Sequence, residues 1–248
     1  MLGLASTLTG GSVSEWTPEE LGTALQVWLK NDTDITNLSG TDGEEDNRLQ
    51  WSDQSGNANH AFQDTNDNKP TITGGGLDFG LESSDYMTFT SGFDFDHPKA
   101  FTMFFVVRRE SVLTQCALLG QSATEFIAFK NNDDKVGVRN AGTGGDNVTV
   151  TFTESNLWPT SETFIFAVSK DANGDLLFYK NGVNKTESGG GTSRADGDQM
   201  DILYLGSKTG SSHNFDGIMY EVIISNRLLS DADLANVDGY LKSKFTLG

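Results

Sequence analysis

Short apolar stretches separated by turn residues follow one another along most of the last two thirds of the chain. Residues 148–152 (Val-Thr-Val-Thr-Phe) alternate apolar and polar side chains, the pattern of a strand with one face on a core and one in water. Residues 101–109 are almost continuously apolar, as expected of a central strand buried on both faces. Further strands are predicted over residues 164–169, 176–180, 202–205 and 218–225. About ten to thirteen strands at this spacing favour an antiparallel two-sheet sandwich over an α/β fold.

The two ends of the chain carry different signals. Residues 1–15 are rich in Gly, Ser and Thr and are predicted to form an N-terminal arm, ahead of a single domain over residues 16–248. Thr17 is a good N-cap, Pro18 suits the first helical position and Glu20 completes a capping box, so a short N-terminal helix is expected to run to about Leu25.

A second short helix is predicted at the C-terminus. Ser230 can cap it, and the apolar residues that follow fall near helical spacing. These are Leu234, Val237, Leu241 and Phe245. Gly239 lies inside this helix and weakens it by about 1 kcal/mol relative to alanine.

Charge and composition exclude several classes of function. The formal net charge of −18 repels phosphates and anionic lipids, so no nucleic-acid partner is expected. No apolar run approaches the roughly 20 residues that span a bilayer, so no membrane insertion is expected either. Cys116 is the only cysteine and lies in an apolar stretch, which predicts a buried structural thiol. The N-terminus lacks a secretory signal, so synthesis in a cytoplasm is expected.

Four segments carry a resemblance to a known family. Residues 51–61 (WSDQSGNANHA) resemble the W-x-D-x-S-G-x-x-N-x-A segment of concanavalin A-like, laminin-G-like jelly-roll domains. Residues 177–182 resemble their L-x-x-Y-x-N-G hairpin, residues 215–222 their F-x-G-x-I-x-E-V strand, and residues 226–230 its N-R-x-L-S exit. The resemblance covers roughly residues 25–246 and implies an all-β, concanavalin A-like jelly-roll sandwich with a short helix at each end.

The motif residues have structural explanations. Asn181-Gly182 sets a type I′ hairpin turn, and Gly182 and Gly217 permit positive φ or close backbone approach. The resemblance therefore implies a fold more strongly than an activity, because such sandwiches serve lectins, adhesion modules, glycosidases and virion proteins alike.

The N-terminal part adds a narrower resemblance. A Gly/Ser arm, the Thr-Pro-Glu-Glu turn, residues 27–31 and residues 51–56 together resemble laminin-G-like structural proteins of tailed, notably marine, bacteriophages. This resemblance implies a virion structural protein, either decorating the capsid or associated with the tail, that displays a lectin-like sandwich. Its expected partners are other virion proteins and host-surface glycans, and a homo-oligomer is compatible with it.

Catalytic and metal-binding patterns are weak. Glycosidases of this fold use E-x-D-x-x-E along one strand, and the nearest match, Asp196-Gly197-Asp198-Gln199-Met200-Asp201, contains no glutamate. That loop could bind calcium, although a solvated acidic turn is favoured, and Asp171-Ala172-Asn173-Gly174-Asp175 is favoured as a hairpin turn over a calcium loop. His60, His97 and His213 lie far apart in sequence, which disfavours zinc.

The sequence therefore predicts a protein that is not an enzyme. No catalytic or metal-ligating residue is predicted, the ligand-binding residues are unknown, and no cofactor is expected, with calcium as the alternative. Two other functions stay open: a soluble carbohydrate-binding, lectin-like module and, less favoured, a glycoside hydrolase.

Overall fold

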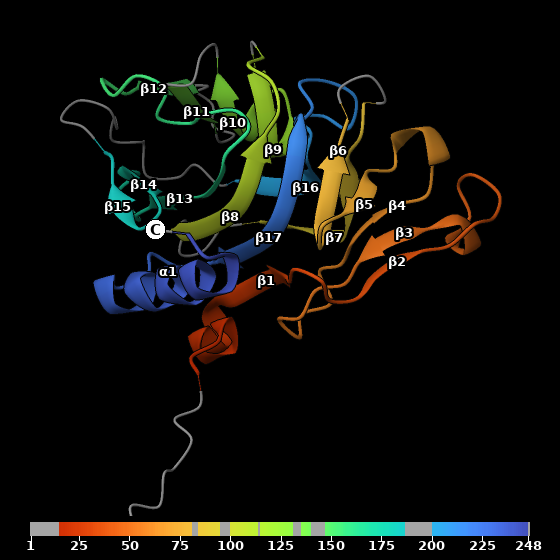
Figure 1. Ribbon diagram of the computed structural model, residues 1–248, viewed down its shortest axis with the longest axis horizontal. Helices are drawn as coiled ribbons and strands as arrows, with labels where there is room; N and C mark the ends of the chain where they lie inside the picture. Colours follow the sequence, from red (N-terminus) through yellow and green to blue (C-terminus); the bar gives the residue numbers. More distant parts are fainter. Residues whose placement is uncertain are drawn as a thin grey trace, which may run out of the picture.

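The computed structural model describes residues 15–80, 84–94, 100–113, 115–130, 135–139, 147–186 and 200–247. These residues form two antiparallel sheets packed face to face, with one α-helix beneath them (Figure 1). The expected all-β, antiparallel two-sheet sandwich is confirmed. Within the described residues there are more strands than expected, because residues 31–76 also contribute short strands.

Sheet A has the order β15, β14, β13, β8, β17, β6, β5, and β1 also pairs with β17. The bounds are β15 Val183–Asn184, β14 Leu176–Lys180, β13 Thr163–Lys170, β8 Phe101–Arg109, β17 Gly217–Ser225, β6 Gly76–Phe79, β5 Thr71–Thr73 and β1 Leu25–Leu29.

Sheet B has the order β12, β11, β10, β9, β16, β7, β4, β3, β2. The bounds are β12 Asn147–Thr151, β11 Lys135–Arg139, β10 Glu125–Lys130, β9 Gln115–Ser122, β16 Asp201–Leu205, β7 Met87–Asp94, β4 Ala61–Gln63, β3 Leu49–Trp51 and β2 Ile35–Asn37. Two short 3-10 turns lie in this part of the chain: η2 (Glu45–Asn47) between β2 and β3, and η3 (Asn66–Asn68) between β4 and β5.

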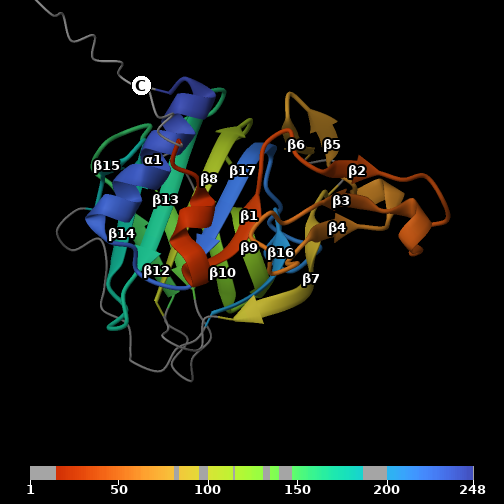
Figure 2. The same ribbon diagram turned by 90° about the horizontal axis from the view of Figure 1, so that it is seen from below.

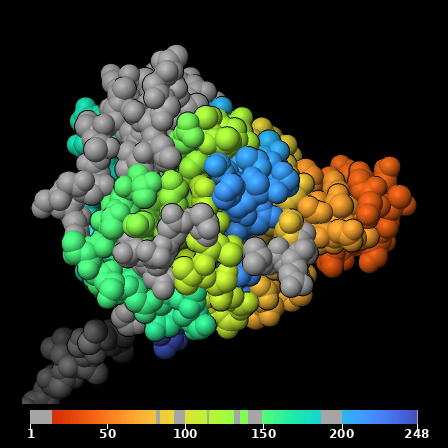
Figure 3. Space-filling model, turned by 90° about the horizontal axis from the view of Figure 1, so that it is seen from above, coloured from red at the N-terminus to blue at the C-terminus, as the bar shows by residue number. Residues whose placement is uncertain are grey.

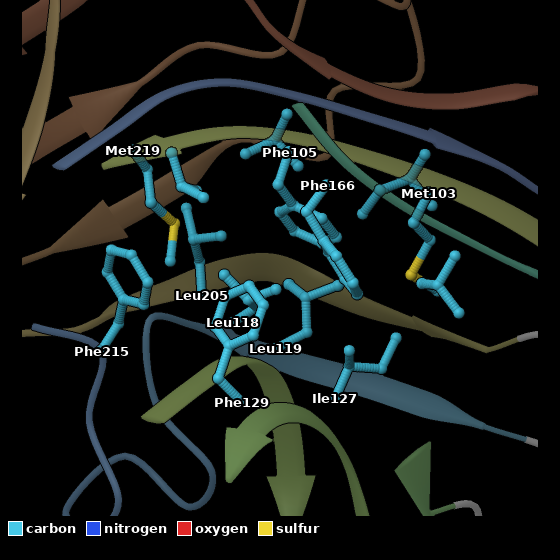
Figure 4. Packing of buried hydrophobic residues seen from close by; sticks show 14 of the residues in the cluster. Met103, Phe105, Leu118, Leu119, Ile127, Phe129, Phe166, Leu205, Phe215 and Met219 are labelled. Atoms are coloured by element: carbon cyan, nitrogen blue, oxygen red, sulfur yellow. The ribbon is translucent and has the colours of Figure 1, made fainter. Parts of the chain in front are cut away.

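The main core lies between the sheets (Figure 4). Met103, Phe105 and Phe166 project from sheet A toward Ile127 and Phe129 of sheet B. The ring of Phe129 lies 5.1 Å from that of Phe166, in an edge-to-face arrangement that adds to simple burial of area.

Cys116 lies in the same core, as predicted. Burial raises the pKa of its thiol to about 11, so the thiol stays protonated at neutral pH. A protonated, buried thiol is a packing group and not a nucleophile.

A second apolar layer covers the outer face of sheet A. Phe104 and Val106 point away from the main core and are still buried, because the C-terminal helix and the N-terminal segment lie across them (Figure 2). This explains the continuous apolar character of β8: odd-numbered residues face sheet B and even-numbered residues face the helix layer. The prediction that residues 101–109 are buried on both faces is confirmed.

The C-terminal helix α1 (Asp231–Phe245) begins as predicted. The Ser230 side chain accepts a hydrogen bond of 3.2 Å from the backbone N–H of Asp233, which satisfies one free donor of the first turn. Val237 and Leu241 are its buried residues and pack into the outer layer on sheet A. No helix among the described residues has the length and apolar character to cross a membrane.

The predicted short N-terminal helix is present, but its predicted side-chain cap is not. Residues Pro18–Ala24 form a 3-10 segment, η1, interrupted at Gly22 by a positive φ of 59°. The Thr17 side chain makes no capping bond; only its carbonyl accepts a bond, from the N–H of Glu20. The break at Gly22 prevents the regular turns that a capping box would stabilise, and the segment ends one residue before Leu25, which begins β1. The predicted arm lies almost wholly outside the described residues.

Candidate functional site

The first motif of the resemblance is organised by one carboxylate. Asp53 is buried and its Oδ1 accepts hydrogen bonds from the backbone N–H groups of Trp28 (2.8 Å) and Ser55 (2.9 Å). Its Oδ2 accepts bonds from the Ser55 hydroxyl (2.6 Å) and the Asn59 N–H (3.0 Å), while its own N–H donates to His60 Nδ1 (3.0 Å). The segment therefore ties the loop after β3 to β1, and its polar atoms are used internally.

The glutamate of the β17 motif has an equally structural environment. The side chain of Glu221 is fully buried beneath α1. Its Oε1 accepts bonds from Trp28 Nε1 and Tyr240 Oη, both at 2.8 Å. Its Oε2 accepts bonds from Lys244 Nζ at 2.6 Å and from the N–H of Asn31 at 3.3 Å. Burial and the Glu221 carboxylate raise the pKa of Tyr240. In all, four donors from three segments converge on Glu221.

The glycines of the other two motifs are explained by the backbone conformations that they allow. Asn181 and Gly182 both have positive φ, 47° and 73°, as a type I′ turn requires. A Cβ at Gly217 would lie 2.1 Å from the carbonyl oxygen of Arg108 on the neighbouring strand, so only glycine allows this approach.

The acidic segments singled out from the sequence divide into two cases. Asp171 Oδ1 accepts the N–H groups of Asn173 (2.9 Å) and Asp175 (2.8 Å), so this loop is the predicted hairpin turn. Residues 196–199 of the other segment lie outside the described residues. Asp201 begins β16, and its N–H donates to Glu125 Oε1 at 3.1 Å.

Glu125, which accepts this bond, is a buried carboxylate. Burial raises its pKa, while the hydrogen bond from Asp201 acts in the opposite direction. Its second oxygen accepts a bond of 3.2 Å from the Ser122 hydroxyl. Both oxygens thus hold the β9–β10 turn to β16, an arrangement that differs from a pair of carboxylates facing a substrate.

The histidines are not brought together. His60 accepts the bond from Asp53, His97 lies outside the described residues, and His213 lies in the loop between β16 and β17. Across the described ranges, no group of three or more His, Cys, Asp or Glu side chains is placed to hold a metal ion.

A polar hollow at the rim of sheet B is the best candidate site. Its volume is about 260 Å³, and it lies between the β16–β17 loop, the start of β9 and Ser84. Asn214 is buried and its Oδ1 accepts a bond of 2.8 Å from the Ser207 hydroxyl, but its amide nitrogen has no partner among the described residues. The buried amide nitrogen of Gln115, from the opposite wall, also lacks a described partner. Buried polar atoms without partners are uncommon, so two donors in one hollow indicate a place for an acceptor.

The loop that carries Asn214 is firmly held. The N–H of Ala117 on β9 donates to the carbonyl of His213 at 2.9 Å, and the N–H of Phe215 closes the loop on Gly206 at 2.7 Å. Gly206 and Gly210 have positive φ, 77° and 76°, which lets the chain turn sharply there. The hollow is therefore preformed, as small-ligand sites usually are. No sequence pattern predicted it, because its walls come from segments about 100 residues apart.

A second groove, of about 300 Å³, lies between α1 and sheet A. Phe104, Ile165 and Leu234 give it a mainly apolar lining. It lacks the converging unpaired donors of the rim hollow, which we therefore prefer as the candidate site.

Comparisons with known proteins agree with this architecture. Residues 81–235 match the model of the concanavalin A-like lectin/glucanases superfamily, more than half of the chain. No curated protein sequence matches the chain.

Two solved structures illustrate the likeness in fold. The Trypanosoma rangeli sialidase in complex with sialic acid aligns over 87% of this chain with a TM-score of 0.54 and 13% identity. The binding domain of botulinum neurotoxin serotype G aligns over 77% of this chain with a TM-score of 0.55 and 14% identity. The chain spans 32% of the sialidase and 49% of the toxin domain, so the likeness concerns one sandwich within larger proteins.

The two-sheet sandwich and the match over residues 81–235 agree: the chain belongs to the concanavalin A-like lectin/glucanases superfamily.

Proposed function

We propose that the chain is a carbohydrate-binding module without catalytic activity, which holds a glycan in the rim hollow of sheet B. The observation that carries the proposal is that two residues of the hollow's lining, Asn214 and Gln115, each hold a buried amide nitrogen without a described partner. Sugar hydroxyls are acceptors of suitable size for such donors. The family includes lectins, and the similar sialidase was solved with sialic acid, which supports a saccharide ligand.

A glycan array with and without calcium tests this function. The wild-type protein should bind a defined set of saccharides, and Asn214→Ala and Gln115→Ala should each weaken binding. Asn236→Ala, on the solvent-exposed side of α1, is the matched control and should bind normally. Circular dichroism establishes that each variant is folded. Silence of the wild-type protein on both arrays would contradict the proposal.

The absence of catalysis needs its own measurement. β-Glucans, agars and alginates incubated with the protein should release no reducing sugar. Release that is lost in Glu125→Gln would replace this proposal with glycoside hydrolysis, since Glu125 is a buried carboxylate whose pKa is raised by burial.

Display on a virion is a second candidate, favoured by the resemblance of the N-terminal motifs to phage structural proteins. The described chain begins on the α1 side: the ring of Trp16 lies 6.4 Å from that of Tyr240. Sheet B, whose rim carries the hollow, lies on the other side of the sandwich from α1 (Figures 1 and 2). An anchor on the α1 side would therefore leave the hollow facing outward.

The virion candidate predicts that the protein is a stoichiometric component of purified particles. Deletion of residues 1–15 should abolish incorporation while the domain stays folded. Normal incorporation of the truncated protein would show that the arm does not anchor it. Absence of the full chain from purified particles would contradict the virion role.

A further inference from the structure

The outer face of sheet B has a floor of very small residues. Ile127 and Phe129 of β10 face the core, so Phe126 and Ala128 point outward. Ala128 pairs with Ala117 on β9 and with Gly137 on β11. This floor continues from the rim hollow, because the N–H of Ala117 is bonded to the hollow's own loop. Figure 3 shows this side, where the blue segment around residue 205 lies beside the yellow-green β9–β10 segment.

Two glycines in this floor make room for lysines. A Cβ at Gly137 would lie 2.6 Å from Cε of Lys130, and a Cβ at Gly120 would lie 2.7 Å from Cα of Lys208. Glycine inside a strand weakens it and often marks close approach of another segment. At Gly137 the approaching group is the Lys130 side chain, whereas at Gly120 it is the backbone of Ser207 and Lys208, so both glycines let a segment that carries a lysine lie close against the sheet.

Two lysines lie against the outward ring of Phe126, and an arginine lies on the neighbouring strand. Nζ of Lys208 lies 4.5 Å and Nζ of Lys130 5.6 Å from the ring centroid. Arg139 is the strand partner of Phe126 on β11, and its guanidinium donates to the carbonyl of Ala123 at 3.0 Å. Within the described part of the chain, neither Lys208 nor Arg139 has a carboxylate within 4.0 Å. Carboxylates outnumber cations about two to one in this chain, with 35 acidic and 17 basic residues.

The cations act on one another and on the hollow. Burial, then Lys208 and Arg139, lower the pKa of Lys130, and burial, then Arg139, lower that of Lys208. The pKa of His213, in the wall of the hollow, is lowered by burial and then by Lys208 and Lys130. The positive groups and the hollow are thus close enough to interact electrostatically, and an anion would relieve the repulsion between Lys208 and Arg139.

We propose that Lys208, Arg139 and Lys130 form an anion subsite beside the rim hollow, and that the ligand is an acidic saccharide. Its carboxylate or sulfate group lies on the cations, and its hydroxyl groups reach Gln115 and Asn214 in the hollow. This assignment rests on the proposed carbohydrate-binding function and names its substrate class. A single-stranded nucleic acid fits less well, because Phe126 is buried and offers no face for base stacking, and the net charge of −18 repels a long polyanion.

Calorimetric titration of the whole chain tests the subsite. The probes are a sulfated heparin tetrasaccharide, tetragalacturonate as the carboxylated probe, and neutral maltotetraose. At least one acidic probe should bind more tightly than maltotetraose, and its affinity should fall as salt is raised. The double variant Lys208→Gln/Arg139→Gln should bind it roughly tenfold more weakly. The matched control Lys242→Gln/Arg227→Gln removes the same charge near α1, from pairs with Asp238 and Asp233, and should bind normally.

The outcomes separate the two proposals. If neutral glycans bind in the hollow but no acidic probe binds better, the subsite is wrong and the carbohydrate-binding function stands. If no saccharide binds at all, both are wrong. Equal loss in both double variants would reduce the effect to net charge and overturn the subsite. Equally tight binding of a four-nucleotide DNA would overturn the assignment to saccharides.

Discussion

At the scale of single residues, Glu221 makes a sharp prediction. Glu221→Gln should lower the free energy of unfolding by about 2 kcal/mol, because an amide nitrogen would then face the Lys244 ammonium in a buried site. Urea denaturation measures the change. Glu154→Gln removes a carboxylate that is half exposed and pairs with Lys185, and should cost less than about 0.5 kcal/mol. Equal costs for the two variants would show that the buried cluster contributes no more than a surface ion pair.

Removing the carboxylate of Asp78 should have the opposite effect and raise the free energy of unfolding at neutral pH. Burial first, then the carboxylates of Glu110, Asp216 and Asp85, raise its pKa, while Arg108 acts in the opposite direction. A folded-state pKa above the unfolded value gives full stability below the unfolded pKa, about 4, and loses it as the pH rises through the folded value. Asp78→Asn should therefore raise the urea midpoint at pH 7 and match the wild type at low pH. A lower midpoint at pH 7 would mean that the attraction of Arg108 outweighs burial.

At the scale of elements, two glycines should respond in opposite directions to the same substitution. Gly217→Ala places a methyl group against the Arg108 carbonyl at a φ of 136° and should destabilise by about 2 kcal/mol or more. Gly239→Ala lies on the exposed side of α1, with nothing within 4 Å of the new methyl, and should stabilise by up to about 1 kcal/mol. Thermal unfolding should show the two melting temperatures on either side of the wild-type value.

The elements also show which structural features can be predicted from local sequence. The alternation over residues 148–152, the apolar run of β8 and the Ser230 cap predicted their elements correctly, because each depends on neighbours in the chain. The short N-terminal helix is present over Pro18–Ala24, but it is a 3-10 segment interrupted by the positive φ at Gly22 and lacks the Thr17 side-chain cap that the sequence predicted. The β17 motif marked Glu221, but its four donors come from β1, α1 and the residue at 31, so only the folded chain reveals its role.

At the scale of the whole molecule, the candidate site was beyond the reach of sequence patterns. Lys130, Arg139 and Lys208 are spread over almost eighty residues, and three different strand pairings and a loop bring them together. Each is an ordinary surface cation in isolation. The net charge of −18 argued against nucleic-acid and anionic-lipid partners, but a sum over the chain does not show where cations gather among the described residues.

This contrast between total and local charge predicts opposite salt effects on two measurable quantities. Raising the ionic strength from about 0.01 M to 0.15 M shortens the screening length from about 30 Å to about 8 Å. Repulsion among 35 acidic residues then weakens, so the melting temperature should rise. The affinity for the acidic saccharide should fall over the same range, because its attraction to Lys208 and Arg139 is screened as well. Melting curves and titrations in one salt series measure both. A melting temperature that falls with salt would show that local attractions outweigh the repulsion from the net charge. An affinity that rises with salt would show that the whole acidic surface, and not the cation cluster, dominates the approach of the ligand.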